Sequence, residues 1–327
     1  MDYVVIGIAV LMGCIVGWSI GANDAANSLG VAVGSKVVTL RRALVLICVF
    51  GFLGAFLQGS HVVKTIGKGI IPIGDQSKHM QYYIAMCASF ASFAWVLLAT
   101  YWKMPISTSH SIVGAVAGAG LAIHAPVDWS KLRDVFICWI TTPLGSAAIA
   151  FVLYFVLKRV FHKIVPERHA GRTISILIVL SGCYVAYSWG ANDVANAVGV
   201  ISYSGILSVN NALLLGGIAI LIGVVTWGYK VIETIGSDIV DMLPLMAFAA
   251  QLASAINVHV YTLAGIPVST SHSIVGAVVG VGLVRGVRVV NLSIMREIFI
   301  CWMATPFITG VISFGTLKIL VWTLHLK

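Results

Sequence analysis

The segment GANDAANSLG at residues 21–30 returns as GANDVANAVG at 190–199, and PISTSHSIVGA at 105–115 returns as PVSTSHSIVGA at 267–277. The two offsets are 169 residues (190−21) and 162 residues (267−105). Both segments are polar and contain glycine, and both lie within apolar sequence. This pattern predicts two related halves that contribute to one shared site.

Shorter echoes extend the repeat beyond these two motifs. They are VVKTIG at 62–67 with VIETIG at 231–236, and CWITTP at 138–143 with CWMATP at 301–306. Their offsets, 169 (231−62) and 163 (301−138) residues, match those of the longer motifs. A near-constant offset along the chain indicates that a whole unit was duplicated.

The composition indicates a membrane protein. Hydrophobic residues make up 59% of the chain, charged residues 9%, and the mean hydropathy is +1.01. Soluble domains carry charge on about a quarter of their residues. Residues 4–20 form an apolar run without a basic preceding segment, which favours a retained first span over a signal peptide. The six cysteines lack the spacing of metal ligands and are interpreted as small apolar residues.

Apolar runs of helical length predict an all-α polytopic protein with five crossings in each half. The expected spans are 3–30, 43–60, 81–102, 105–123 and 134–157, then 173–200, 209–229, 244–263, 267–285 and 297–323. The halves cover residues 1–157 and 173–327, and the basic segment 158–172 links them. An odd number of crossings inverts the second half relative to the first. Half-helices are then expected to meet near the midplane.

The basic residues predict the orientation in the membrane. The net charge of +9 arises from residues in short loops, so it favours topology signals over nucleic-acid binding. With the N-terminus outside, cytoplasmic loops hold 13 of the 20 Lys and Arg residues, and the other seven are at positions 64, 68, 78, 131, 133, 318 and 327. We therefore expect a multi-pass protein of the cell membrane with both termini outside and the central linker in the cytoplasm. The apolar spans 43–57 and 209–225 offer a face for a homodimer.

Two carboxylates fall deep inside the expected spans. Asp24 and Asp193 occupy matching positions in the G-A-N-D-x-A-N motifs. An Asp at the centre of a membrane helix costs about 2.5–3.5 kcal/mol or more, which makes it a functional candidate. The alternative, a structural carboxylate bonded to a neighbouring helix, accounts less well for two matched copies.

The asparagines of the motif add neutral oxygen ligands. Asn23 and Asn27 are four residues apart, as are Asn192 and Asn196, so each pair can share a helix face. Gly21 and Gly190 are expected to let the helix unwind and turn carbonyls toward a cation. Hard oxygen ligands of this kind suit Na⁺. Interhelical hydrogen bonding is the competing interpretation, strongest for Asn27 and Asn196.

The second motif has the chemistry of an oxyanion receptor. Pro105 and Pro267 are expected at the start of a helix, with hydroxyl side chains in its first turn. Unpaired N–H groups and the helix dipole favour an anion there. The predicted ligands are Ser107, Thr108, Ser109, Ser269, Thr270 and Ser271, joined by Asp24 and Asp193. The alternative is that these hydroxyls only cap a helix. N-capping explains one such run well, but it explains less well why the run is repeated in both halves.

His110 and His272 follow the hydroxyl run and are secondary candidates. A ring N–H held by a backbone carbonyl is favoured over a proton relay. A zinc site formed by the histidines and aspartates lacks the usual ligand spacing. No Lys or Arg lies in the motifs, so a charged oxyanion needs mobile cations to enter with it. No other cofactor is expected.

The two doubled signatures resemble the PiT family of inorganic phosphate transporters, which are sodium- or proton-coupled permeases, and the resemblance covers nearly the whole chain. It implies inverted repeats and symport of inorganic phosphate between them. It associates Asn23, Asp24, Asn27, Asn192, Asp193 and Asn196 with the cation, and the six hydroxyl residues with phosphate. The central linker is shorter than in the larger eukaryotic members.

These patterns predict a transporter, not an enzyme, that carries phosphate with Na⁺ by alternating access. The alternatives are a proton-coupled phosphate or sulfate permease and a passive anion channel. Phosphate is favoured over sulfate because its remaining O–H can donate to an ionised aspartate. A serine hydrolase is disfavoured because no G-x-S-x-G motif is present.

Overall fold

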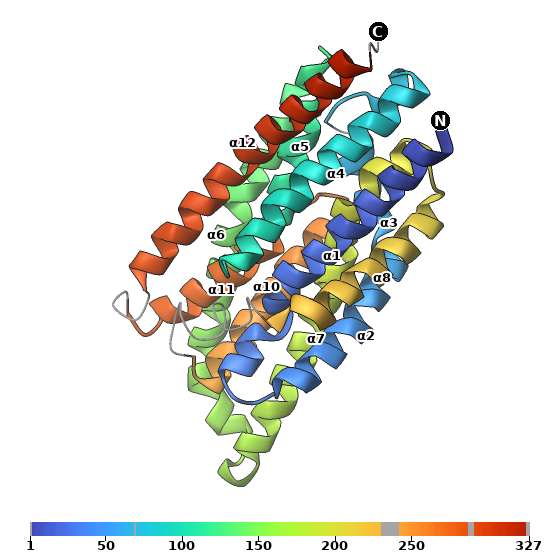
Figure 1. The fold of residues 1–327 in the computed structure, drawn as a ribbon. Helices are drawn as coiled ribbons and strands as arrows, with labels where there is room; N and C mark the ends of the chain where they lie inside the picture. The colour runs from blue at the N-terminus through green and yellow to red at the C-terminus, as the bar shows by residue number, and fades with distance from the viewer. Residues whose placement is uncertain (1, 69, 230–241, 287–290, 325–327) are drawn as a thin grey trace.

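The computed structural model describes residues 2–68, 70–229, 242–286 and 291–324. Within them the chain is helical, and its helices run roughly along one common direction (Figure 1). The first half contains α1 (Asp2–Gly34), α2 (Leu40–Gln58), α3 (Ser60–Lys68), the 3₁₀ turn η1 (Ile73–Asp75), α4 (Lys78–Tyr101), α5 (Thr108–Ala122) and α6 (Trp129–Ile164). The second half contains α7 (Glu167–Tyr203), α8 (Val209–Trp227), α10 (Pro244–Leu263), α11 (Thr270–Leu283) and α12 (Leu292–Thr323).

Each of the ten expected spans corresponds to a helix. Seven helices of the described residues are long and apolar enough to cross a membrane. The sequence did not predict α3 and η1, and the repeat segment 231–236 lies outside the described residues. The basic segment 158–172 is mostly helical, because α6 runs to Ile164 and α7 begins at Glu167. The division of the chain at this segment remains a prediction.

The two halves are inverted relative to each other. The start of α1 and the end of α12 lie at the same end of the bundle, and the turn between α6 and α7 lies at the opposite end (Figure 1). Thus α1 and α7, which carry the G-A-N-D motifs, run in opposite directions. The predicted all-α inverted-repeat fold is confirmed.

The helices α5 and α11 are both too short to span a bilayer. With 15 residues in α5 and 14 in α11, each is roughly 22 Å long, whereas the hydrocarbon core measures about 30 Å. An extended segment precedes each of them, and both helices begin inside the protein, where Thr108 and Thr270 are buried. These are the predicted half-helices.

The halves interlock. The half-helix α5 packs mainly against α12 and α11 mainly against α6, so each half-helix rests on the last helix of the other repeat. Glycine permits this contact: a Cβ on Gly114 would meet the backbone of Pro306, and one on Gly276 would meet the backbone of Pro143. Neither repeat therefore forms a separate packed unit.

The expected unwinding at the G-A-N-D motifs is wrong. Helices α1 and α7 continue through them without a break. A Cβ on Gly21 would collide with the carbonyl oxygen of Ile220 in α8, and one on Gly190 with that of Gly51 in α2. These two glycines allow close helix packing, which places the residues that follow them deep in the protein.

Candidate functional site

Asp24 on α1 and Asp193 on α7 are completely buried. The Oδ2 atom of Asp24 accepts a hydrogen bond from Thr108 Oγ1 at 2.9 Å, and that of Asp193 accepts one from Thr270 Oγ1 at 2.8 Å. Each aspartate therefore lies against the start of the half-helix of its own repeat. Asp24 Oδ1 also lies 3.2 Å from Ser271 Oγ of the other repeat.

Asn27 and Asn196 connect the two repeats. Asn27 Nδ2 lies 3.0 Å from Asp24 Oδ1, 3.2 Å from Thr270 Oγ1 and 2.9 Å from Ser271 Oγ. Asn196 makes the matching contacts, to Asp193 Oδ1 at 3.2 Å and to Ser109 Oγ at 3.0 Å. Each asparagine thus donates to its own aspartate and lies beside the half-helix of the other repeat. The two G-A-N-D motifs and the two S-T-S motifs meet in one place.

Asn23 and Asn192 have a different position. Asn23 Nδ2 donates to Thr100 Oγ1 at 3.0 Å and to the carbonyl oxygen of Met104 at 3.1 Å, while its Oδ1 accepts from the backbone N–H of Ile106 at 3.3 Å. The Asn192 amide contacts Thr262 Oγ1 at 2.9 Å and the backbone N–H of Val268 at 3.3 Å. Both amides hold the extended segment that precedes a half-helix.

The six hydroxyl residues divide into three symmetric pairs. Ser107 and Ser269 are the N-caps of α5 and α11 and accept hydrogen bonds from the backbone N–H of the histidine three residues later. Thr108 and Thr270 donate to the aspartates, as described above. Ser109 donates to the carbonyl oxygen of Val268 at 2.9 Å, and Ser271 donates to that of Ile106 at 2.8 Å. The last pair joins the two repeats across the site.

Pro105 and Pro267 do not begin the half-helices, contrary to expectation. The helices start at Thr108 and Thr270, so each proline lies two residues before the N-cap. The serine side chain takes the capping position instead, because its hydroxyl satisfies an N–H that proline could not. The prolines belong to the extended segments that Asn23 and Asn192 hold.

His110 and His272 lie at the centre of a row of four rings, in which the two imidazoles meet edge to face. Trp139 packs on His110 at 3.6 Å, His110 on His272 at 4.4 Å, and His272 on Trp302 at 3.6 Å between ring centroids. His110 Nδ1 is 3.3 Å from the carbonyl oxygen of Trp302, and His272 Nδ1 is 3.1 Å from that of Trp139. Each Nδ1 therefore carries a proton and donates it, which is the favoured interpretation from the sequence.

Five buried polar atoms of the site have no hydrogen-bond partner within the described residues. They are Asn27 Oδ1, Asn196 Oδ1, the Nε2 atoms of His110 and His272, and Trp139 Nε1. Two are amide oxygens that can only accept, and both belong to residues bonded to an aspartate. Buried polar atoms are normally paired, so these two oxygens indicate a ligand that provides positive charge or donors.

The site carries negative charge without a fixed positive counterpart. Asp24 and Asp193 are the only carboxylates among the buried residues of the described chain, and no Lys or Arg is buried with them. In the same residues, no three His, Cys, Asp or Glu side chains gather as a metal cluster. The available ligands are thus carboxylate, amide and hydroxyl oxygens, which suit a hard cation.

Some residues of the site escaped prediction. Trp139 and Trp302 cover the histidines, and their repeated C-W-x-x-T-P segments were a usable signal. Thr100 and Thr262, also equivalent by the repeat, support Asn23 and Asn192. Gln251 could not be found from the repeat, because the equivalent position in the first half holds a different residue, Ser89 (251−162). Its amide donates to the carbonyl oxygen of Ser28 at 3.2 Å and accepts from Ser181 Oγ at 3.0 Å.

A buried polar site between two inverted repeats, inside a bundle of membrane-spanning helices, defines a membrane transport protein. A family model described as the phosphate transporter family matches residues 20–313. The chain therefore belongs to the phosphate transporter family, which is a family of permeases and not of enzymes.

Individual relatives agree with this assignment. A protein of Thermococcus kodakarensis named "Putative phosphate permease" is 32% identical, with 96% of this chain and 97% of its own length aligned. A Pyrococcus abyssi protein of the same name is also 32% identical over the same shares. A solved structure described as "The sodium-dependent phosphate transporter" superimposes with a TM-score of 0.88 at 30% identity and covers 99% of both chains.

Proposed function

We propose that this protein is a Na⁺-coupled symporter of inorganic phosphate that works by alternating access at the site between Asp24 and Asp193. One observation carries the proposal: the buried amide oxygens of Asn27 and Asn196 have no partner in the part of the chain that the structure describes, and each lies in a residue bonded to a buried aspartate. Oxygen ligands of this type suit Na⁺. The sodium-dependent transporter of similar structure supports the same coupling ion.

Charge balance explains why phosphate and cation must move together. Two ionised aspartates contribute two negative charges, and a phosphate ion adds one or two more. The N-termini of α5 and α11 return roughly half a positive charge each. The negative charge that remains is not offset by Lys or Arg, none of which is buried among the described residues. Phosphate therefore binds well only when more than one mobile cation is already present, which is a coupling between two ligands.

The hydrogen bonds of the closed site suggest how the coupling operates. Thr108 and Thr270 donate their hydroxyl protons to the two aspartates. When Na⁺ neutralises a carboxylate, the threonine hydroxyl is free to turn and donate to a phosphate oxygen. The backbone N–H groups at the start of each half-helix point the same way. Na⁺ binding in this way creates the phosphate site.

The closed site also supports transport over passive flow. All twelve motif residues, Asn23, Asp24, Asn27, Ser107, Thr108, Ser109, Asn192, Asp193, Asn196, Ser269, Thr270 and Ser271, are buried. A channel would need a continuous aqueous path, and it would have no need of buried carboxylates. Phosphate is favoured over sulfate because its O–H can donate to Asp24 or Asp193.

Uptake into proteoliposomes tests the coupling ion and the substrate. We expect an inward Na⁺ gradient to drive ³²P-phosphate above its equilibrium level at fixed voltage, whereas choline in place of Na⁺ leaves background uptake. A pH gradient that drives accumulation without Na⁺ would show proton coupling instead. Equilibration without accumulation would show a channel, and equal competition by sulfate would remove the preference for phosphate.

The aspartates are tested by removing their charge. We expect Asp24→Asn and Asp193→Asn each to abolish Na⁺-driven accumulation while the purified protein keeps its melting temperature within a few degrees. The exposed Asp75→Asn is the matched control and retains uptake. Full Na⁺-driven accumulation by both site variants would exclude the carboxylates from coupling.

The orientation follows from the basic residues. We infer that the end of the bundle with both termini faces outward and that the turn between α6 and α7 lies in the cytoplasm. Apolar side chains on α2 and α8, including Leu57 and Val225, are exposed and provide the face for the proposed homodimer. Labelling of a C-terminal tag in intact cells tests the orientation.

A further inference from the structure

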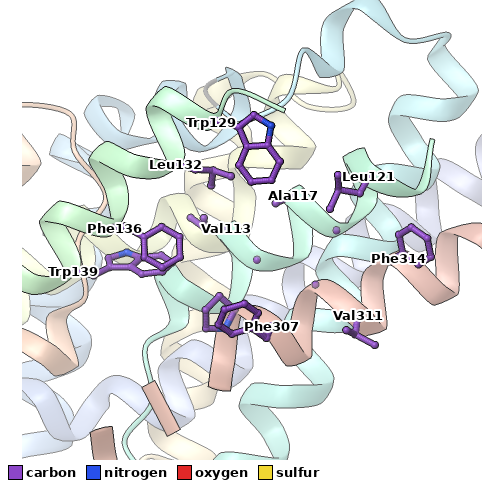
Figure 2. A pocket seen from close by; sticks show the side chains of 14 residues that line it. Val113, Ala117, Leu121, Trp129, Leu132, Phe136, Trp139, Phe307, Val311 and Phe314 are labelled. Atoms are coloured by element: carbon purple, nitrogen blue, oxygen red, sulfur yellow. The ribbon is translucent and has the colours of Figure 1, made fainter. Parts of the chain in front are cut away.

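An apolar groove lies on the outer side of the half-helix α5. It has a volume of about 360 Å³ and is formed by α5, α6 and α12. Figure 2 shows its walls: Val113, Ala117 and Leu121 from α5, Trp129 and Phe136 from α6, and Phe314 from α12. The glycines at 114, 118 and 310 lower the walls where α5 and α12 touch. The volume falls in the range of small-molecule and lipid sites.

The position of the groove determines what can reach it. Its rim residues Trp129, Phe307 and Val311 are 67%, 69% and 73% exposed. They belong to α6 and α12, two of the helices long and apolar enough to cross a membrane. Large apolar side chains exposed on such helices face hydrocarbon. The groove is therefore open to the acyl chains of the bilayer.

A cationic side chain lies on α6 one helical turn from two of the residues that line the groove. Arg133 follows Trp129 by four residues and precedes Phe136 by three, so all three share one face of α6. The guanidinium is bonded to Asp134 at 3.1 Å, with 70% and 64% of the two side chains exposed. An exposed pair of this kind is weak, which leaves the guanidinium available for a phosphate group. A tryptophan beside an arginine near a helix end is typical of the membrane interface.

We propose that this groove binds one acyl chain of an anionic phospholipid and that Arg133 holds the lipid phosphate. The chain descends along α5 from Trp129 toward Trp139, which closes the inner end of the groove. This site is separate from the site between the repeats, and the proposal stands whether or not transport depends on Na⁺.

The residues that line the groove differ from those at the equivalent surface beside α11. By the repeat offsets, Ala117, Trp129 and Gly310 correspond to Val279, Leu292 and Ala147 in the second repeat. Two small groove residues, Ala117 and Gly310, are thus replaced by larger ones beside α11, whereas the rim residues Trp129, Phe307 and Val311 are replaced by the smaller Leu292, Leu144 and Ala148. The charged pair is kept there as Arg296 and Glu297. The second repeat is therefore an internal control with the same charges, but with lower walls and less room between them.

The lipid also contacts the side chain that covers the transport site. Trp139 lines the groove with one part of its ring and stacks on His110 with another, 3.6 Å between centroids. His110 is in the first turn of α5, next to Ser109. Because the half-helix must move relative to its neighbours during alternating access, a chain wedged between α5 and α12 acts on the moving part.

Photolabelling in liposomes tests the proposal. The full-length protein is reconstituted with a trace of phosphatidylglycerol that carries a diazirine in mid-chain, irradiated and mapped by mass spectrometry. We expect the groove residues 113–121, 129–139 and 306–314 to be labelled about tenfold more than the equivalent residues 275–283, 292–302 and 143–151. This ratio corresponds to the free energy gained when about two methylene groups of the lipid move into apolar contact. Equal labelling of both sets would mean bulk lipid only and would overturn the proposal.

Two variants make the test specific. Ala117→Leu fills the groove and Trp129→Leu copies the second repeat at an exposed position, so both should lower labelling of residues 129–139 severalfold. Val279→Leu, at the equivalent of Ala117, should leave it unchanged. Arg133→Gln should remove the preference for phosphatidylglycerol over a phosphatidylcholine probe with the same chain. Undiminished labelling in both groove variants refutes the site, and displacement of the probe by inorganic phosphate would refute the lipid assignment.

Discussion

Replacing the two threonines that donate to the aspartates isolates their role in phosphate binding. Thr108→Val and Thr270→Val keep the shape of the side chain and remove only the hydroxyl. In the closed site these hydroxyls lie 2.9 Å and 2.8 Å from carboxylate oxygens, and both are buried. If each hydroxyl turns to a phosphate oxygen once Na⁺ is bound, the valine variants lose one hydrogen bond to an anion in the loaded state.

The expected magnitude follows from the charge on the acceptor. A hydrogen bond to a charged group contributes about 1.5–3 kcal/mol, which corresponds to roughly a 10- to 150-fold rise in the KM for phosphate. The Na⁺ concentration for half-maximal uptake should not rise, because valine removes a donor that competes with Na⁺ for the carboxylate. The two variants should be less than additive when combined, since both hydroxyls bind one ion.

The measurement is initial ³²P-phosphate uptake in proteoliposomes over a range of phosphate at saturating Na⁺, and of Na⁺ at saturating phosphate. Thr309→Val is the matched control, because Thr309 is also completely buried but donates only to backbone carbonyls of its own helix. A phosphate KM within twofold of the unaltered protein in both site variants would refute the role of the hydroxyls. A rise confined to the Na⁺ requirement would refute the proposed order of events.

Two further predictions concern the surroundings of the site. Gly190→Ala adds a Cβ that meets the backbone of Gly51, so we expect overpacking to destabilise the fold by about 1–3 kcal/mol and to lower the melting temperature. Gly7→Ala is the control and should not lower the melting temperature, because no atom lies within 4 Å of the added Cβ. An unchanged melting temperature for Gly190→Ala would contradict the close contact of α2 and α7. His110→Phe keeps a ring between Trp139 and His272 but loses the hydrogen bond to the carbonyl oxygen of Trp302. One such bond contributes about 0.5–1.5 kcal/mol, so Na⁺-driven uptake should fall only about 2- to 12-fold. Complete loss of uptake, at an unchanged melting temperature, would assign the imidazole a direct part in transport.

The sequence predicted the architecture because repetition and hydropathy are both visible in it. Ten apolar runs and two doubled motifs were enough for the inverted repeats, and the run from Pro105 to Ser109 indicated a half-helix. The interlocking of α5 with α12 was not predictable, since the glycines that permit it look like any other glycine in a membrane helix. Only the neighbouring backbone distinguishes close packing at Gly21 from the unwinding that we expected there.

The site itself was predicted as a set of residues, but not as an arrangement. Chemistry and spacing singled out Asp24 and Asp193 correctly as buried groups near the hydroxyl runs. Spacing alone could not separate Asn27, which lies beside the other repeat, from Asn23, which holds a loop of its own repeat. That difference depends on where the extended segments run, and they carry no periodic pattern. The assignment of individual ligands to Na⁺ and phosphate stays a prediction.

The crossed contacts of Asn27 and Asn196 make each repeat depend on the other. Because each asparagine lies against the half-helix of the other repeat, a single unit lacks the serine partner of its own asparagine. One repeat alone would therefore need a second copy, inserted in the opposite orientation, to complete these contacts. The covalent link between the repeats holds that antiparallel pair in one chain.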